Sequence, residues 1–176
     1  VKNIILEEIK SDLADFGVRF DVWYSEASLS ERGLINKSID TLADRGHVFD
    51  DGGARWFRSS DFDDEKDRVV VRDNGVNTYF AADIAYHYDK FARGYKDVID
   101  IWGADHHGYI ARVKAAMQAS GLDPGQVEIL LVQFVTLFRN GEKMAMSTRA
   151  GEFVTLKQLV NEVGVDAARF FYVMRR

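Results

Sequence analysis

A polar cluster, Asp105-His106-His107, directly follows an apolar run and Gly103. This order is typical of a strand, a tight turn and the start of a helix, where α/β proteins bind anionic ligands. The glycine lets a ligand approach the backbone, Asp105 can accept hydrogen bonds from hydroxyl groups, and the imidazoles can serve phosphate oxygens. Alternatively, Asp105 only caps the helix and the histidines are surface residues. Adjacent histidines point in different directions on a helix, so we predict no metal site.

A second cluster places cations and hydroxyl groups on the glycine-bounded loop 141–151. It contains Lys143, Ser147, Thr148 and Arg149. Cations beside a nucleotide pocket can stabilise the charge that develops on transferring phosphate groups. The alternative is an exposed polar loop, because lysine and arginine normally lie on surfaces.

A third cluster, Tyr79, Asp83 and His87, has a spacing of four residues, so its members share one face of a helix. A carboxylate and a phenol on one face could hold a guanidinium or ammonium group. The alternative is a carboxylate that favours the helix start, with the aromatic residues packed in the core.

The elements that position these clusters follow from periodicity and from turn residues. In the first part of the chain we predict a helix over 1–16, a strand over 20–24, a helix over 28–46 capped by Ser28 or Ser30, a hairpin of 48–49 with 54–58, and a strand over 69–71. The acidic segment 61–67 lacks the ligand spacing of a calcium loop, which favours a solvated connector.

In the second part, a helix over 83–91 precedes an apolar strand, a helix over 108–119 and a β-leaning stretch over 128–138. Two strands joined by a helix favour a parallel βαβ unit. Thr155 can then cap a helix, Gly164 ends it, and 165–174 forms another.

Composition limits the classes of protein. The 176 residues are 47% hydrophobic and carry a formal net charge of -5, which suits one domain or two small ones and argues against a freestanding nucleic-acid binder. Without cysteine there is no disulfide or thiolate metal site, and we expect a cytoplasmic protein without membrane contact. The start at Val1 and the end at Arg176 suggest a piece of a longer protein.

Further evidence comes from the order of several segments. They are residues 20–26, 56–59, 78–87, 100–109, 146–156 and 166–171. Together they resemble the class I aminoacyl-tRNA synthetases, and among them the bacterial arginyl-tRNA synthetases, over essentially the whole chain.

The resemblance implies an ATP-dependent ligase that converts L-arginine to arginyl-adenylate and transfers it to tRNA(Arg). It implies that Tyr79 and Asp83 hold the arginine side chain and that Gly103, Asp105 and His106 lie against the adenosine of ATP. It also implies Mg²⁺ arriving with ATP, and we expect a monomer without a tightly bound cofactor.

The segment Met146-Ser147-Thr148-Arg149 matches the family's signature loop, usually Lys-Met-Ser-Lys-Ser, which steadies the leaving pyrophosphate. We assign Met146 to ATP binding and the other three residues, with Lys143, to catalysis. The signature's lysines fall on Ala145 and Thr148, so its cationic role passes to Arg149, to Lys143 or to a lysine outside this chain.

The family's early His-Ile-Gly-His-type motif is absent, because the four histidines are His47, His87, His106 and His107. We therefore expect the chain to be inactive alone. The implied fold is α/β: the second half of a Rossmann-like nucleotide-binding domain with a small insertion and C-terminal helices.

The resemblance also implies three parts. Residues 1–74 are an α+β insertion (connective) module, residues 75–140 are the Rossmann-like half with the arginine and ATP site, and residues 141–176 hold the signature loop and begin the helical linker towards the anticodon-binding domain. Two other interpretations stay open: a non-catalytic module that binds a nucleotide or arginine, and a protein-interaction fragment.

Overall fold

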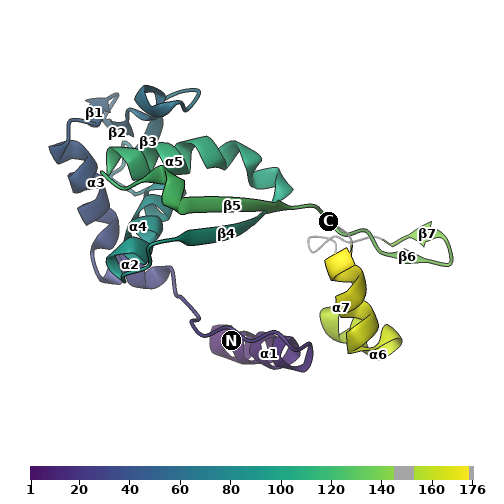
Figure 1. The fold of residues 1–176 in the computed structure, drawn as a ribbon. Helices are drawn as coiled ribbons and strands as arrows, with labels where there is room; N and C mark the ends of the chain where they lie inside the picture. The colour runs from purple at the N-terminus through teal and green to yellow at the C-terminus, as the bar shows by residue number, and fades with distance from the viewer. Residues whose placement is uncertain (145–152, 175–176) are drawn as a thin grey trace. The chain divides into compact units, whose positions relative to one another are not determined.

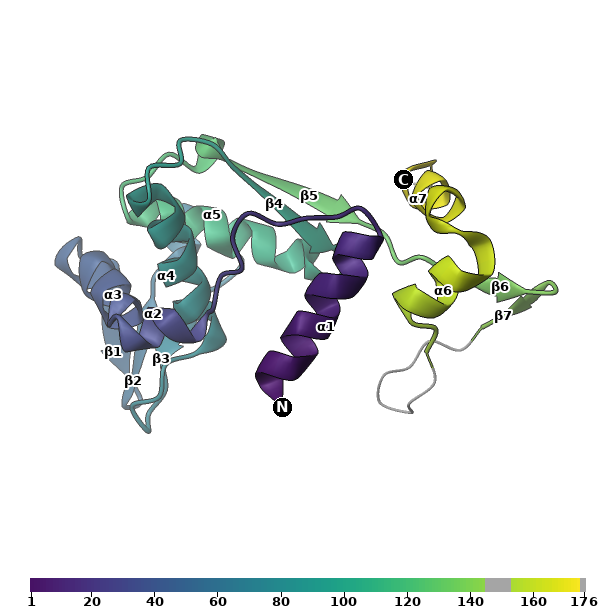
Figure 2. The same cartoon turned by 90° about the horizontal axis from the view of Figure 1, so that it is seen from below.

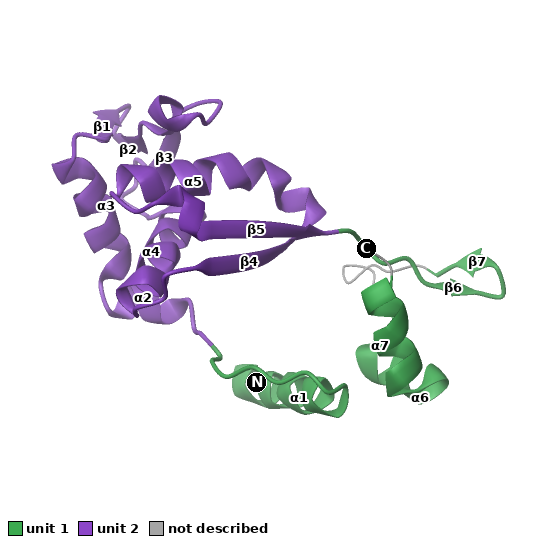
Figure 3. Ribbon diagram, viewed as in Figure 1, with its two compact units in different colours: residues 1–23, 133–176 green, residues 24–132 purple. Residues whose placement is uncertain are grey.

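The computed structural model describes residues 1–144 and 153–174, and the chain divides into two compact units. One unit is Tyr24–Val132, and the other is Val1–Trp23 with Gln133–Arg176 (Figures 1 and 3). Helices combine with parallel and antiparallel strands, which confirms the α/β class. The two units are defined by which parts of this chain contact one another. The division into three parts at residues 74 and 140 is a separate one and stays a prediction. In the described part of the chain, no helix is long and apolar enough to cross a bilayer.

The Tyr24–Val132 unit contains a three-stranded antiparallel sheet. Its strands are β1 (Val48–Asp51), β2 (Ala54–Phe57) and β3 (Arg68–Val71), in that order. The predicted hairpin is confirmed: Gly52 and Gly53 join β1 to β2 with φ angles of 58° and 80°, which residues with a Cβ rarely adopt.

The same unit contains the predicted parallel βαβ arrangement. Helix α4 (Tyr79–Ala92) precedes β4 (Val98–Gly103), and α5 (Ile110–Ala119) connects β4 to β5 (Val127–Val132). The two strands pair in parallel from Val98 opposite Val127 to Gly103 opposite Val132. Helix α5 runs beside the two strands (Figures 1 and 2), so the prediction of a parallel unit is confirmed.

The core of this unit lies where α3 (Leu34–Asp44), α4 and α5 meet the antiparallel sheet. Each helix and the sheet contribute a fully buried side chain, namely Leu42, Phe57, Ile84 and Met117. Phe57 packs against Phe62 and Phe80, with ring centroids 6.1 and 6.3 Å apart. Each buried side chain of this size contributes about 1.5–3 kcal/mol. This packing holds α4, the helix that carries Tyr79 and Asp83.

The other unit consists of α1 (Lys2–Asp15), the short strands β6 (Phe138–Arg139) and β7 (Glu142–Lys143), and the helices α6 (Leu156–Val163) and α7 (Val165–Met174). Arg169 donates a 2.8 Å hydrogen bond to the carbonyl of Phe16, and the Phe16 and Tyr172 rings meet edge to face. These contacts join α7 to the end of α1.

Two predicted helix signals in this unit are confirmed. The Thr155 hydroxyl accepts from the N–H of Gln158, whose side chain accepts from the N–H of Thr155, which forms a capping box at the start of α6. Gly164, with a φ of 82°, ends that helix.

The predicted strand over 20–24 is wrong. No strand forms there, and Phe20 and Val22 are more than half exposed. The alternation of apolar and polar residues is present, but a strand also needs a neighbour for its backbone hydrogen bonds. For β5 the prediction extends too far, because the strand ends at Val132.

The predicted helix over 28–46 is two helices, because Gly33 takes a left-handed φ of 66° between α2 (Ala27–Glu31) and α3. Ser28 and Ser30 lie inside α2 and cap neither helix. In the acidic segment 61–67, Asp64 is also not solvated as predicted: it is 7% exposed and pairs with Arg68, with 2.6 Å between Oδ1 and Nη2.

Candidate functional site

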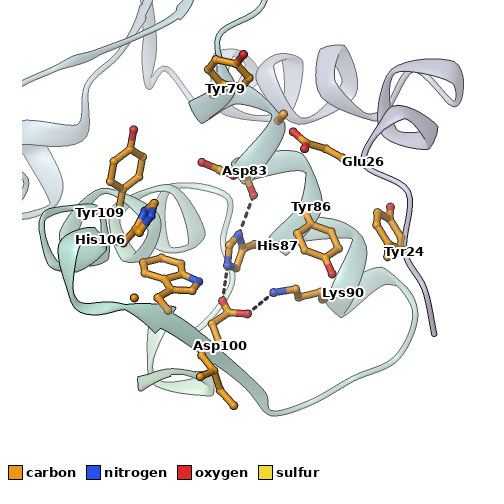
Figure 4. A pocket seen from close by; sticks show the side chains of 14 residues that line it. Tyr24, Glu26, Tyr79, Asp83, Tyr86, His87, Lys90, Asp100, His106 and Tyr109 are labelled. Atoms are coloured by element: carbon orange, nitrogen blue, oxygen red, sulfur yellow. Dashed lines mark hydrogen bonds and ion pairs between the residues drawn. The ribbon is translucent and has the colours of Figure 1, made fainter. Parts of the chain in front are cut away.

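A cavity of about 750 Å³ opens beside α4, β4 and the 3-10 turn Ala104–Tyr109. Most of the side chains that line it are of two kinds (Figure 4). The large aromatic ones are Tyr24, Tyr79, Tyr86, Trp102 and Tyr109. The ionisable ones are Glu26, Asp83, His87, Lys90, Asp100 and His106. The cavity therefore offers aromatic surface and charges of both signs to a polar ligand.

The first two turns of α4 place Tyr79 and Asp83 on the cavity wall. Thr78 fixes the start of this helix, because its hydroxyl accepts a hydrogen bond from the N–H of Ala81 at 3.3 Å. The Tyr79 side chain is 81% exposed, whereas Asp83 is half-buried and lies nearer His87 in Figure 4. The structure thus places the predicted guanidinium pair on one wall, with the carboxylate deeper than the phenol.

The Asp83 carboxylate has no hydrogen-bond or ion-pair partner among the described side chains. Burial is the main cause that raises its pKa, and the negative charge of Glu26 adds to this effect. Positive charge on His87, His106 and Lys90 acts in the opposite direction. A partly buried carboxylate without a partner favours a cationic ligand, since such a ligand would restore the interactions that Asp83 lost with water.

Below Asp83, a buried bridge joins α4 to β4. His87 Nε2 lies 2.6 Å from Asp100 Oδ2, and Lys90 donates to the other Asp100 oxygen. His87 Nδ1 lies 2.8 Å from the carbonyl oxygen of Asp83. Burial disfavours the charge of Asp100, but the hydrogen bonds from His87 and Lys90 outweigh that cost and hold its pKa below the usual range. Asp100 is therefore a carboxylate between two donors.

The turn after β4 brings Gly103 and His106 to the same cavity. A Cβ on Gly103 would lie 2.5 Å from Asp105 Oδ1, so this position favours glycine while Asp105 keeps its orientation. Asp105 Oδ2 lies 3.6 Å from His106 Nε2, and both side chains are 55% exposed. Neither helical start here has a side-chain cap, so Asp105 is not the N-cap of that alternative, whereas His106 and His107 are exposed, as the same alternative expects.

The predicted loop cluster lies largely outside this description. Met146, Ser147, Thr148 and Arg149 are outside the described residues. Lys143 is an exposed residue of β7 in the other compact unit. The joint action of these residues stays a prediction.

Sequence reasoning missed Tyr24, which lines the cavity beside Tyr86 at a ring distance of 4.6 Å. Its hydroxyl donates a 2.9 Å hydrogen bond to Asp89, a buried carboxylate that also pairs with Arg32 and Arg93. The partners are far apart in the sequence, so no local spacing indicates them.

Sequence reasoning also missed the pairing of Asp100 with His87 and Lys90, although one signal was present. Asp100 shares a strand face with the buried Val98, between the exposed Ile99 and Ile101. A charged residue on the buried face of a strand needs partners.

Comparisons with known proteins identify the family of this chain. Residues 1–171 match the family described as tRNA synthetases class I (R), catalytic domain. An arginine–tRNA ligase of Thioalkalivibrio sulfidiphilus is 62% identical over 99% of this chain, and one of Nitrosospira multiformis is 60% identical over 100%. The chain spans 30% of the length of each. A solved structure described as an arginyl-tRNA synthetase of Campylobacter jejuni matches with a TM-score of 0.91 at 41% identity, covering 99% of this chain and 38% of that one.

Proposed function

This chain belongs to the arginine–tRNA ligases of the class I tRNA synthetases, and from that premise we propose that the complete protein activates L-arginine with ATP and transfers it to tRNA(Arg). The resemblance found in the sequence is confirmed. Apart from family membership, the main observation that supports the proposal is the Asp83 carboxylate. It lines an aromatic-walled cavity and has no hydrogen-bond or ion-pair partner among the described side chains.

In this proposal, Asp83 and Tyr79 hold the guanidinium group of arginine. The ligand supplies the positive charge that burial makes favourable beside Asp83, and planar N–H groups can reach both carboxylate oxygens at once. Glu26, on the same cavity, adds negative charge. Aromatic side chains, including Tyr86 and Trp102, exclude water from the stem of the ligand.

ATP occupies the side of the cavity formed by the turn after β4. The absence of a Cβ on Gly103 lets the Asp105 side chain lie against its backbone, and Asp105 and His106 would present an acceptor and a ring to the adenosine. The arginine carboxylate attacks the α-phosphorus of ATP, a carboxyl–phosphate bond forms, and the bond to pyrophosphate breaks. Positioning and charge stabilisation lower the barrier, because the reaction needs little covalent help from side chains.

We assign stabilisation of the leaving pyrophosphate to Ser147, Thr148, Arg149 and Lys143, with Met146 beside ATP. Mg²⁺ would arrive with ATP and neutralise part of the phosphate charge. Among residues 1–144 and 153–174, no three His, Cys, Asp or Glu side chains lie together as a candidate metal site, so we assign that ion no ligand set from this chain. The expected monomeric state and cytoplasmic location stay predictions.

The test is arginine-dependent exchange of pyrophosphate into ATP. We expect the complete protein to catalyse it, and the chain alone to show no more exchange than a blank in which Asp105, Thr148 and Arg149 are all replaced by alanine. If the chain alone exchanges pyrophosphate faster than this blank, the expectation that it is inactive is wrong. A complete protein that binds arginine and ATP without exchange would be a binding module instead.

A further inference from the structure

The bridge between His87 and Asp100 joins the two proposed subsites, and this inference rests on the function proposed above. We propose that His87 is a positioning residue that holds the arginine-binding turn of α4 in register with the nucleotide-binding turn after β4. No reacting atom needs to touch His87 for this role. It acts through Asp83, one helical turn before it, and through Asp100, three residues before Gly103 on β4.

The hydrogen bonds define the charge of this bridge. Both ring nitrogens of His87 face oxygen acceptors: the Asp83 carbonyl at 2.8 Å and Asp100 Oδ2 at 2.6 Å. A carbonyl oxygen accepts only, and a carboxylate accepts only, so the form of the ring that satisfies both contacts is the cationic one, with hydrogen on both nitrogens. Asp100 therefore lies between two cations, His87 and Lys90, both from α4.

Burial keeps water away from this arrangement. His87 is 4% exposed and Asp100 is 8% exposed, so water does not easily replace either partner. Removing one member of a buried ion pair leaves an uncompensated charge, which is strongly unfavourable. The relative position of α4 and β4 thus depends on this contact, and with it the distance between the Asp83 carboxylate and the Gly103 backbone.

The cationic ring also acts on Asp83 directly. Among the described residues, the charges that act on this carboxyl are those of His87 and Lys90 from α4, His106 from the 3-10 turn, and Glu26 at the start of α2. Among them, His87 is the largest influence that opposes the effect of burial and favours the ionised form. Since only ionised Asp83 can pair with a guanidinium, losing the charge of His87 should weaken arginine binding first at acid pH.

The test uses His87→Gln in the complete protein. Glutamine keeps a donor for Asp100 and removes the charge. From exchange rates measured across pH, we expect KM for arginine to rise about tenfold, as for loss of the hydrogen bond that the charged ring donates to the Asp83 carbonyl, and more than KM for ATP. The acid limb of 1/KM for arginine should move to higher pH. The matched control, His47→Gln, changes a histidine that packs on Phe62 away from the cavity and should leave these values unchanged.

Equal rises in both KM values, or an acid limb that does not move, would overturn the positioning role. Absence of arginine-dependent exchange in the unmodified complete protein would instead overturn the proposed function. If circular dichroism shows that His87→Gln does not fold, Asp100→Asn decides by the same comparison of KM values. Loss of the fold in both variants would assign the bridge to stability alone and also overturn the positioning role.

Discussion

Replacing Asp83 by alanine in the complete protein should raise KM for arginine far more than KM for ATP. The carboxylate is half-buried and has no partner among the described side chains, so its substitution breaks no ion pair within residues 1–144 and 153–174. What is lost is its interaction with the ligand. A hydrogen bond to a charged group contributes about 1.5–3 kcal/mol, which corresponds to a rise in KM of about ten- to a hundredfold.

The same substitution should leave the fold intact and can even stabilise it. Burial raises the pKa of Asp83, so the ionised form is less favourable in the folded protein than in the unfolded chain. Stability therefore falls as the pH rises through the folded pKa, and alanine removes this effect. We expect the melting temperature at neutral pH to be equal to or above that of the unmodified protein.

The assay is arginine-dependent pyrophosphate exchange at varied arginine and at varied ATP. Asp97→Ala is the matched control, because it removes the same charge from an exposed position outside the cavity. Equal changes in both KM values for Asp83→Ala, or an equal effect of Asp97→Ala, would refute Asp83 as the guanidinium partner.

Three further substitutions test the surrounding structure in the complete protein. Gly103→Ala should move the exposed Asp105 side chain, since its Oδ1 lies 2.5 Å from the new Cβ. It should therefore raise KM for ATP several-fold with little change in melting temperature. An unchanged KM for ATP would contradict the proposal that the turn after β4 binds ATP. Asp64→Asn should cost about 3 kcal/mol of unfolding free energy at pH 7, because it leaves Arg68 without its buried partner. Burial disfavours the charge of Asp64, but the hydrogen bonds and charge of Arg68 outweigh this effect and lower the pKa of Asp64 in the folded protein. The stabilisation is therefore present above the pKa of the unfolded chain and is lost as pH falls through the pKa of the folded protein. If urea unfolding shows the same loss of stability at acid pH in Asp64→Asn, this explanation is wrong. Phe57→Ala should destabilise by about 3–5 kcal/mol in the same assay, and a cost below about 1 kcal/mol would contradict its place in the core.

Local patterns predicted much of this fold. The helix cap at Thr155, the hairpin at Gly52 and the break at Gly164 each depend on a few neighbouring residues, so they can be recognised without knowledge of the tertiary structure. The parallel pairing of β4 with β5 followed from two apolar strands joined by a helix.

The errors have a different physical origin. Gly33 interrupts a helical pattern, but a glycine inside a helix costs only about 1 kcal/mol, so periodicity alone cannot show that the chain breaks there. The strand expected over 20–24 has the right alternation and no partner. A strand is stable only through its neighbours, which a single segment does not reveal.

Half of the candidate site could be predicted, and the rest depends on contacts distant in the sequence. Tyr79 and Asp83 share a wall because they are four residues apart on one helix. The bridge from His87 to Asp100 requires a particular register of α4 against β4, and the support of Tyr24 by Asp89 joins residues 65 positions apart. Spacing within one element contains no information about either contact.

The most direct test of the central claim is a calorimetric titration of the complete protein with L-arginine and with L-citrulline, which has the same length but no positive charge. We predict that arginine binds at least about tenfold more tightly, because the partly buried Asp83 carboxylate gains a charged partner only from arginine. Equal affinities for the two ligands would contradict it.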